Sequence, residues 1–256
     1  MSAISGLDAN EARAAAEEFG VSLGQIERDH LISIILAALS GSHSDELVFF
    51  GGTALARTHL PHGRLSEDID LICTGDRTAI ADRIERTITR SLRATHGRPD
   101  WTPSLSSVRE TLPAVLRVAD GLTLRVQLLH QRGYPAWPTE HRDLYQRYSD
   151  VSPAKLRVLT LESFVASKTA AWHDRAAPRD LYDLWCLANI GAITKGAAQL
   201  FARYGPISSP PQGWMFRTPP SADRWQAQLA GQTRLEISSH DALAVVRDAW
   251  NTVVGD

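Results

Sequence analysis

The amino-acid sequence predicts an α+β protein built as two lobes. Strand-like and helix-like patterns alternate through residues 1–150, which we expect to form a lobe around a small mixed sheet. Residues 151–256 carry mainly helical patterns, and the loop GYPAWPTE (133–140) precedes the change. A chain of 256 residues with 43% hydrophobic and 22% charged side chains is typical of a globular protein large enough for two lobes.

The first lobe is expected to begin with two helices and a strand–turn–helix unit. Asp8 is placed to cap a helix over residues 8–20, and a second helix is expected over 23–40. The apolar segment Leu47–Phe50 predicts a strand, which is followed by two glycines and a helix that begins near Thr53.

A second strand and an amphipathic helix follow. Alternation in Asp68–Cys73 predicts the strand, and the pattern is helical from Asp76 or Thr78 to about Thr95. The apolar side of this helix consists of Ile80, Ala81, Ile84, Ile88 and Leu92. Its opposite side carries four arginines, namely Arg83, Arg86, Arg90 and Arg93.

The remaining pattern completes the sheet and then becomes helical. Two strands are expected at Ser107–Ala119 and Leu122–His130, joined by a tight turn at Asp120-Gly121. Helices in the second lobe are expected at 160–175, 179–190, 195–204, 221–230 and 239–253.

Charge and composition exclude several classes of protein. The net charge of −2 gives no overall attraction to nucleic acid, so any such site must be a local basic patch. The two cysteines, Cys73 and Cys186, lie in apolar runs and are expected in the core. The N-terminus lacks a secretory signal pattern, and the longest apolar run, Leu31–Leu39, is too short to span a bilayer. The sequence therefore predicts a soluble, cytoplasmic protein with no membrane partner.

The predicted strand Asp68–Cys73 places two carboxylates on one face. Successive side chains of a strand point to opposite faces, so Asp68 and Asp70 share one face while Ile69 lies on the other. Mg²⁺ (or Mn²⁺) prefers oxygen ligands and would offset the repulsion between these carboxylates. The pair predicts a metal site, and a solvated strand face is the alternative.

A phosphate cradle is expected just upstream, at Gly51-Gly52-Thr53. Glycines let the backbone approach a phosphate, and the N-terminus of a helix with a hydroxyl side chain supplies donors. A plain turn at a helix start is the alternative. Thr53 and Asp68 are fifteen positions apart, and the cradle and the carboxylate pair together suit a nucleoside triphosphate with Mg²⁺.

Two segments resemble the motifs of a known family. FFGGTALARTHLPHGRLSEDIDLIC (49–73) closely resembles the first motif of the polymerase-β-like nucleotidyltransferases, and within them of the AbiEii toxin family, which includes the MenT-type toxins. Members carry a Gly-Gly-Thr/Ser turn and then an Arg-x-Ser-x-Asp-x-Asp strand. LESFVASKTAAWHDRAAPRDLYDLWCLA (161–188) resembles the second motif, and the resemblance covers about residues 45–190.

The resemblance implies that residues 1–150 form a polymerase-β-like nucleotidyltransferase lobe and that the protein is a toxin with a cognate antitoxin. It implies nucleotide transfer from a nucleoside triphosphate to an RNA, such as the 3′ end of tRNA, which would block translation. The implied nucleotide ligands are Gly51, Gly52, Thr53, Ser66, Lys168 and Arg179. The implied catalytic residues are Ser66, Asp68, Asp70, Lys168, Asp180 and Asp183, with Asp68 and Asp70 as the metal ligands.

The second motif adds positive charge. Lys168 on a helix that faces the cleft would neutralise triphosphate charge, and Asp180 and Asp183, at i and i+3, could orient it or an arginine. The alternatives are a surface lysine at Lys168 and, at Asp180, a first-turn acid favoured by the helix dipole.

One position departs from the family pattern. Many polymerase-β-like enzymes carry a third carboxylate on a later strand, and Gln127 occupies that in-register position here. Either one metal suffices, or Asp180 or Asp183 acts as the base, or the activity is low.

The sequence is compatible with more than one acceptor for the nucleotide. The row Arg83, Arg86, Arg90 and Arg93 fits a track for an RNA backbone, with a solvated helix face as the alternative. Two other functions also fit the pattern, namely a nucleotidyltransferase that modifies a small molecule such as an antibiotic, and a non-catalytic nucleotide-binding module.

Overall fold

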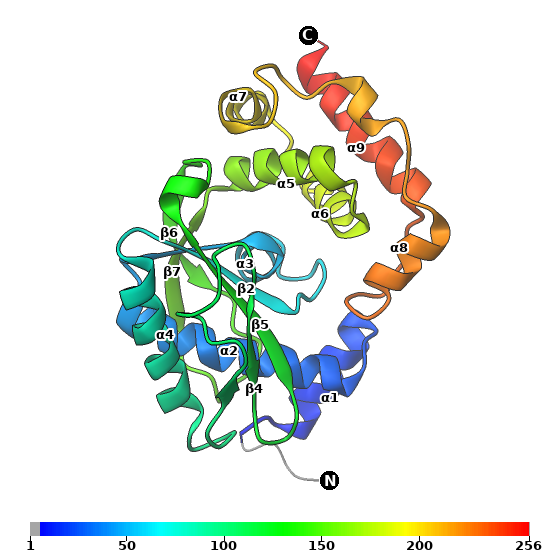
Figure 1. Cartoon of the computed structure of the whole chain (residues 1–256). Helices are drawn as coiled ribbons and strands as arrows, with labels where there is room; N and C mark the ends of the chain where they lie inside the picture. Colours follow the sequence, from blue (N-terminus) through cyan, green and yellow to red (C-terminus); the bar gives the residue numbers. More distant parts are fainter. Residues whose placement is uncertain (1–5, 256) are drawn as a thin grey trace. The chain divides into compact units, whose positions relative to one another are not determined.

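The computed structural model describes residues 6–255, which form two compact units (Figure 1). The first unit runs to Tyr134 and includes Glu140–Val158. The second unit comprises Pro135–Thr139 and the chain from Leu159 onward.

A mixed seven-stranded sheet organises the first unit. Its order is β3-β4-β5-β2-β1-β7-β6, in which β2–β5 and β1–β7 are parallel while β1–β2, β3–β4 and β4–β5 are antiparallel. The strands are β1 (Leu47–Phe50), β2 (Asp68–Cys73), β3 (Asp100–Trp101), β4 (Ala114–Arg117), β5 (Thr123–His130), β6 (Thr139–Leu144) and β7 (Ala154–Leu159). The helices of this unit are α1 (Ala9–Phe19), α2 (Leu23–His43), α3 (Gly51–Thr58), α4 (Arg77–Leu92) and the short 3₁₀ helix η1 (Gln131–Gly133).

One face of the central strands is apolar. Ile69 and Leu71 of β2 and Val126 of β5 are fully buried, and α2 and α4 pack on each other and contact β5. The predicted apolar side of α4 is confirmed, since its buried residues are Ile80, Ala81, Ile84, Ile88 and Leu92. Asp8 and Asp76 cap α1 and α4 by accepting main-chain N–H groups, so both helix starts follow from local sequence.

The sheet is larger than the sequence predicted, because β3, β6 and β7 were not expected. The strand predicted at 107–119 is reduced to Ala114–Arg117. Residues 102–113 form a loop instead, and the Glu85 carboxylate of α4 accepts the main-chain N–H groups of Leu105 and Ser106 within it. The helix after β1 begins at Gly51, slightly earlier than expected.

The second unit is helical, as predicted. Its helices are α5 (Leu161–Arg175), α6 (Pro178–Asn189), α7 (Lys195–Tyr204), α8 (Ala222–Leu229) and α9 (Ser239–Val254), with a 3₁₀ helix η2 (Gly213–Phe216). α6 packs on α9 and α5 on both α6 and α7, around buried Phe164, Phe201 and Trp250. Pro178 occupies the first turn of α6, where a missing N–H costs nothing.

The two cysteines differ in burial. Cys73 is fully buried, as predicted, and burial raises the pKa of its thiol. The prediction for Cys186 was wrong in part, because this residue of α6 is only partly buried. Within residues 6–255, the structure contains no helix with both the length and the apolar content needed to cross a membrane.

A buried ion pair joins α2 to α3. The Arg57 guanidinium is 1% exposed and its Nη2 lies 2.8 Å from Asp29 Oδ1. Tyr148 donates its hydroxyl to Asp29 Oδ2 at 2.9 Å. Burial lowers the pKa of Arg57 to about 10, so this side chain stays charged at neutral pH and depends on Asp29 as its counter-charge.

Replacing Asp29 with alanine is expected to lower the free energy of unfolding by about 3–5 kcal/mol, because Arg57 would remain buried without a counter-charge. Urea denaturation followed by circular dichroism measures the change. The exposed Asp45→Ala serves as the control and is expected to stay within about 0.5 kcal/mol of the wild type. Equal unfolding free energies for the two variants would contradict this assignment.

Candidate active site

The two aspartates of β2 share the polar face of the sheet. Both are half-buried, whereas Ile69 between them is fully buried. In the parallel pairing with β5, Asp68 lies opposite Arg125 and Asp70 opposite Gln127. Residues opposite each other in a ladder point to the same face, so two acids, an arginine and a glutamine form one polar surface.

Gly51 allows the start of α3 to approach Asp70. Its φ is +78°, a conformation that L side chains rarely adopt, and a Cβ at this position would collide with the Asp70 carboxylate. Phe50, directly before it, pairs in register with Asp70. The centroid of its ring lies 4.9 Å from that of the Tyr134 ring. The helix start, the carboxylate and an aromatic edge therefore meet at one place.

Gly52 makes room for two buried polar side chains. A Cβ on Gly52 would lie 2.8 Å from Arg64 Nη2 and 3.2 Å from Ser66 Oγ. No side chain caps the N-terminus of α3, and the first N–H groups of a helix favour an anion. These features give the predicted cradle the chemistry of a phosphate site, with a fixed guanidinium beside it.

The Thr53 side chain forms a hydrogen bond that links α3 to β2. It is buried, and its hydroxyl donates to the main-chain carbonyl of Asp68, which ties α3 to β2. The carboxylates are thereby fixed relative to the glycine pair. A role for the Thr53 side chain in phosphate binding remains a prediction.

Arg125 is bonded to one of the proposed metal ligands. Its Nε lies 2.7 Å from Asp68 Oδ1 and its Nη2 lies 3.0 Å from Asp68 Oδ2, which is a bidentate pair. The hydrogen bond to Asp68, followed by the charge of Asp68, raises the pKa of Arg125. The Arg125 side chain is 51% exposed, so it can leave Asp68 for solvent at modest cost.

Gln127 occupies the register position opposite Asp70, as predicted. Its amide donates to the main-chain carbonyl of Glu110 at 3.0 Å. A neutral amide is a poor ligand for a divalent cation, so β5 adds no third carboxylate to the pair on β2.

The donor set fits a hard divalent cation that is shared with a substrate. Two carboxylates on one face are what Mg²⁺ usually takes from a protein when phosphates and water complete its shell. In the part of the chain that the structure describes, no cluster of three or more His, Cys, Asp or Glu residues could hold a metal by itself. Binding would require Asp68 to exchange Arg125 for the ion.

In the second unit, two buried acids hold Lys168. Its Nζ lies 2.6 Å from Asp183 Oδ2 and 3.3 Å from Asp180 Oδ1. Asp180 also accepts two hydrogen bonds from Arg175, at 2.7 and 3.0 Å. The spacing of Asp180 and Asp183 on α6 therefore orients Lys168 on α5, which is one of the arrangements expected from the sequence. Arg179, next to Asp180, is half-buried.

The predicted arginine row divides into two parts. Arg83 Nη2 lies 2.9 and 2.8 Å from the two carboxylate oxygens of Glu46, and this pair lowers the pKa of Glu46. Arg86, Arg90 and Arg93 instead line a groove beside β3. Arg83 therefore does not belong to the same surface as the other three.

Two residues of the site, Arg64 and Arg125, were not predicted from the sequence. Arg64 is the arginine of the Arg-x-Ser-x-Asp-x-Asp pattern, so the motif itself could have identified it. Arg125 lies two residues before Gln127 on the same strand, so its side chain shares the face of Gln127. Locating Gln127 therefore implied Arg125 as well.

A glycine-rich helix start beside two strand carboxylates is the site expected of a nucleotidyltransferase. Residues 34–253 match the model of the family described as "Nucleotidyl transferase AbiEii toxin, Type IV TA system". The chain belongs to this family of nucleotidyltransferase toxins of type IV toxin–antitoxin systems, and the resemblance seen in its motifs is confirmed.

Comparison with solved structures agrees on the fold. The nucleotidyltransferase toxin MenT4 of Mycobacterium tuberculosis H37Rv is similar with a TM-score of 0.65 and 21% identity, over 94% of this chain and 86% of that one. JHP933 of Helicobacter pylori is similar with a TM-score of 0.57 and 13% identity, over 92% and 94%. At these identities the likeness establishes a shared fold. No curated protein sequence matched the chain.

Arg125→Ala is expected to raise the affinity for Mn²⁺ by up to about fivefold, because the guanidinium competes with the cation for Asp68 across a half-exposed pair. Isothermal titration of the nucleotide-free protein measures the affinity. Arg117→Ala removes the same charge from the exposed end of β4 and is expected to change little. An unchanged or weaker Mn²⁺ affinity for Arg125→Ala would contradict competition at Asp68.

Proposed function

We propose that this enzyme transfers a nucleotide from a Mg²⁺-bound nucleoside triphosphate to an RNA, at the 3′ end of tRNA, and so blocks translation until a cognate antitoxin counteracts it. One observation carries the proposal. The half-buried carboxylates of Asp68 and Asp70 lie on the polar face of β2, and Asp70 approaches Gly51 at the start of α3.

In this proposal the first unit binds the triphosphate. Asp68 and Asp70 would hold Mg²⁺, or Mn²⁺ in its place, which would screen the phosphates and stabilise charge that develops at the α-phosphate. Main-chain N–H groups at Gly52 and the Ser66 hydroxyl donate to the outer phosphates. Arg64, buried against Gly52, adds a fixed positive charge.

Lys168 is proposed to offset the charge of the departing pyrophosphate as a point charge. Its contacts with Asp180 and Asp183 limit its rotamers, and both acids are buried in ion pairs. They therefore fit positioning roles better than the role of a general base, which needs access to the acceptor. Arg179 is proposed as a further phosphate ligand.

Gln127 affects how the acceptor hydroxyl loses its proton when it attacks the α-phosphate. β5 carries no carboxylate opposite Asp70, so no side chain there takes the proton of the acceptor. The proton would pass to solvent, and the rate would depend on alignment of the acceptor and on stabilisation of phosphate charge.

An RNA acceptor is favoured over a small molecule by the character of the surface. Arg86 and Arg90 on α4 and Arg93 directly after it are exposed, whereas a site for a cationic drug would be acidic. Membership of a toxin family also fits a target whose modification stops growth.

The test is incubation of the purified protein with each α-labelled nucleoside triphosphate, total RNA and Mg²⁺. Asp68→Ala is expected to reduce label in RNA by at least roughly a hundredfold, because half of the carboxylate pair is lost. The exposed Asp143→Ala is the control and is expected to retain wild-type labelling.

Three outcomes separate the candidate functions. Label in tRNA that depends on Asp68 supports the proposal. Label that appears only in low-molecular-weight products would replace the RNA acceptor with a small molecule. Nucleotide binding without any labelled product, under conditions where both variants remain folded, would contradict catalysis at this site.

A further inference from the structure

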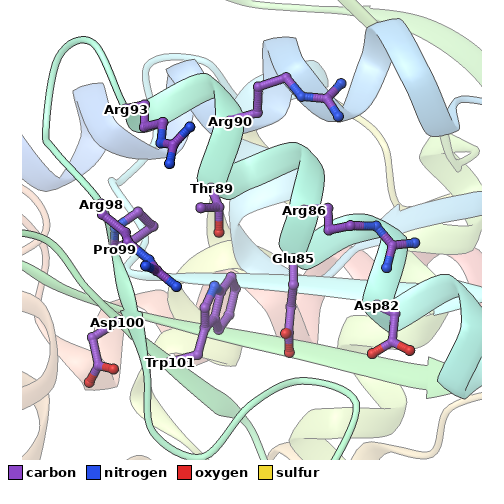
Figure 2. A pocket seen from close by; sticks show the side chains of 10 residues that line it. All are labelled: Asp82, Glu85, Arg86, Thr89, Arg90, Arg93, Arg98, Pro99, Asp100 and Trp101. Atoms are coloured by element: carbon purple, nitrogen blue, oxygen red, sulfur yellow. The ribbon is translucent and has the colours of Figure 1, made fainter.

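A basic groove lies at the β3 edge of the sheet in the first unit, between α4 and the segment that leads into β3 (Figure 2). Its volume is about 810 Å³, which is within the range of ligand sites. The residues that line it are Asp82, Glu85, Arg86, Thr89, Arg90, Arg93, Arg98, Pro99, Asp100 and Trp101.

The four arginines of the groove do not stabilise the fold through hydrogen bonds or ion pairs among the described residues. Among residues 6–255, the structure records no hydrogen bond or ion pair from Arg86, Arg90, Arg93 or Arg98. Two of the three acids in the lining are engaged, since Glu85 accepts main-chain N–H groups and Asp100 accepts the Thr102 hydroxyl at 2.9 Å. The groove therefore offers unsatisfied positive charge, in contrast to the paired Arg83 on the same helix.

Trp101 supplies an aromatic surface among these charges. Figure 2 shows its ring between α4 and the chain at Arg98, with the Arg93 and Thr89 side chains directed toward the same space. The indole N–H of Trp101 has no hydrogen-bond partner among the described residues. A base can stack on such a ring whatever its sequence, because every base has a π face.

We propose that this groove is a docking site for an unpaired segment of RNA, in which one base stacks on Trp101 while the flanking phosphates bind Arg86, Arg90, Arg93 and Arg98. The inference rests on the RNA acceptor proposed above and adds a place where that RNA is held.

The spacing of the arginines favours a nucleic-acid strand. Arg86 and Arg90 are separated by about 6 Å of helix rise, and Arg93 continues the row by about 4.5 Å. Arginines at such regular intervals can pair with the successive phosphates of a nucleic-acid strand, because each guanidinium can bind one phosphate through two N–H groups. An acidic protein segment could also pair with these arginines, but it has no bases to stack on the Trp101 ring.

The position of the groove indicates binding away from the reacting end. β3 lies three places from β2 in the sheet, a separation of about 14 Å at the usual strand spacing. RNA held at the β3 edge would therefore contact the protein at nucleotides other than the one that carries its reacting hydroxyl. The groove would contribute affinity and orientation, and it would leave nucleotide binding at the β2 carboxylates unchanged.

The test measures RNA binding without chemistry. Fluorescence anisotropy of a labelled single-stranded RNA and of tRNA, in EDTA and without nucleotide, is compared for Arg90→Ala/Arg93→Ala and for Arg83→Ala/Arg142→Ala. The second variant removes the same charge outside the groove, since Arg83 does not line it and Arg142 lies on β6 at the other edge of the sheet. The groove variant is expected to bind at least about tenfold more weakly and to lower the salt slope by about 1.4. Trp101→Ala is expected to weaken binding roughly tenfold, and Trp101→Phe is expected to restore most of it.

The outcomes distinguish this inference from the proposed function. Equal losses in the groove and control variants, or none in either, would overturn the docking site even if the wild type labels RNA. Absence of RNA binding by the wild type would overturn the docking site, whereas the proposed function would be overturned only if no RNA is labelled. Loss of binding to a poly-glutamate probe but not to RNA would assign the groove to an acidic protein partner and overturn the inference. Unchanged Mn²⁺–nucleotide binding and melting temperature in all variants confirm that the fold and the nucleotide site are intact.

Discussion

The alternation of side chains along β2 determines where the two aspartates of the candidate active site lie. Ile69 and Leu71 are fully buried on the apolar face of the sheet, so Asp68 and Asp70 must face the other way. Two like charges on one face need compensation, and Arg125 provides it through its bidentate bond to Asp68. A divalent cation, as proposed above, would offset the same repulsion.

The backbone around the pair is shaped by the same constraint. Because Asp70 points toward the start of α3, the residue after β1 must be a glycine, and Gly51 adopts a left-handed conformation in contact with that carboxylate. Thr53 then bonds the main chain of β2. In the second unit, Asp180 and Asp183 are likewise two neighbouring acids compensated by a basic side chain, in this case Lys168.

Local sequence was enough to predict β2, the apolar side of α4 and the identity of the motif residues, because their patterns span only a few turns or strand residues. The ion pair of Arg125 with Asp68 depends on the parallel register of β2 and β5, which joins positions far apart in the chain. The groove at Trp101 likewise requires α4 and β3 to meet. β7 could have been found from the alternating sequence AKLRVL, whereas β3 has only two residues and leaves no pattern.

Asp68 and Asp70 are proposed to form the cation site at which the triphosphate binds. Anomalous diffraction from crystals grown with Mn²⁺ and a non-hydrolysable nucleoside triphosphate tests it most directly. We expect one Mn²⁺ peak in coordination distance of both carboxylates, phosphate density beside Gly51-Gly52, and the Arg125 side chain displaced from Asp68. A Mn²⁺ peak elsewhere, with the Arg125–Asp68 pair intact beside bound nucleotide, would contradict the account.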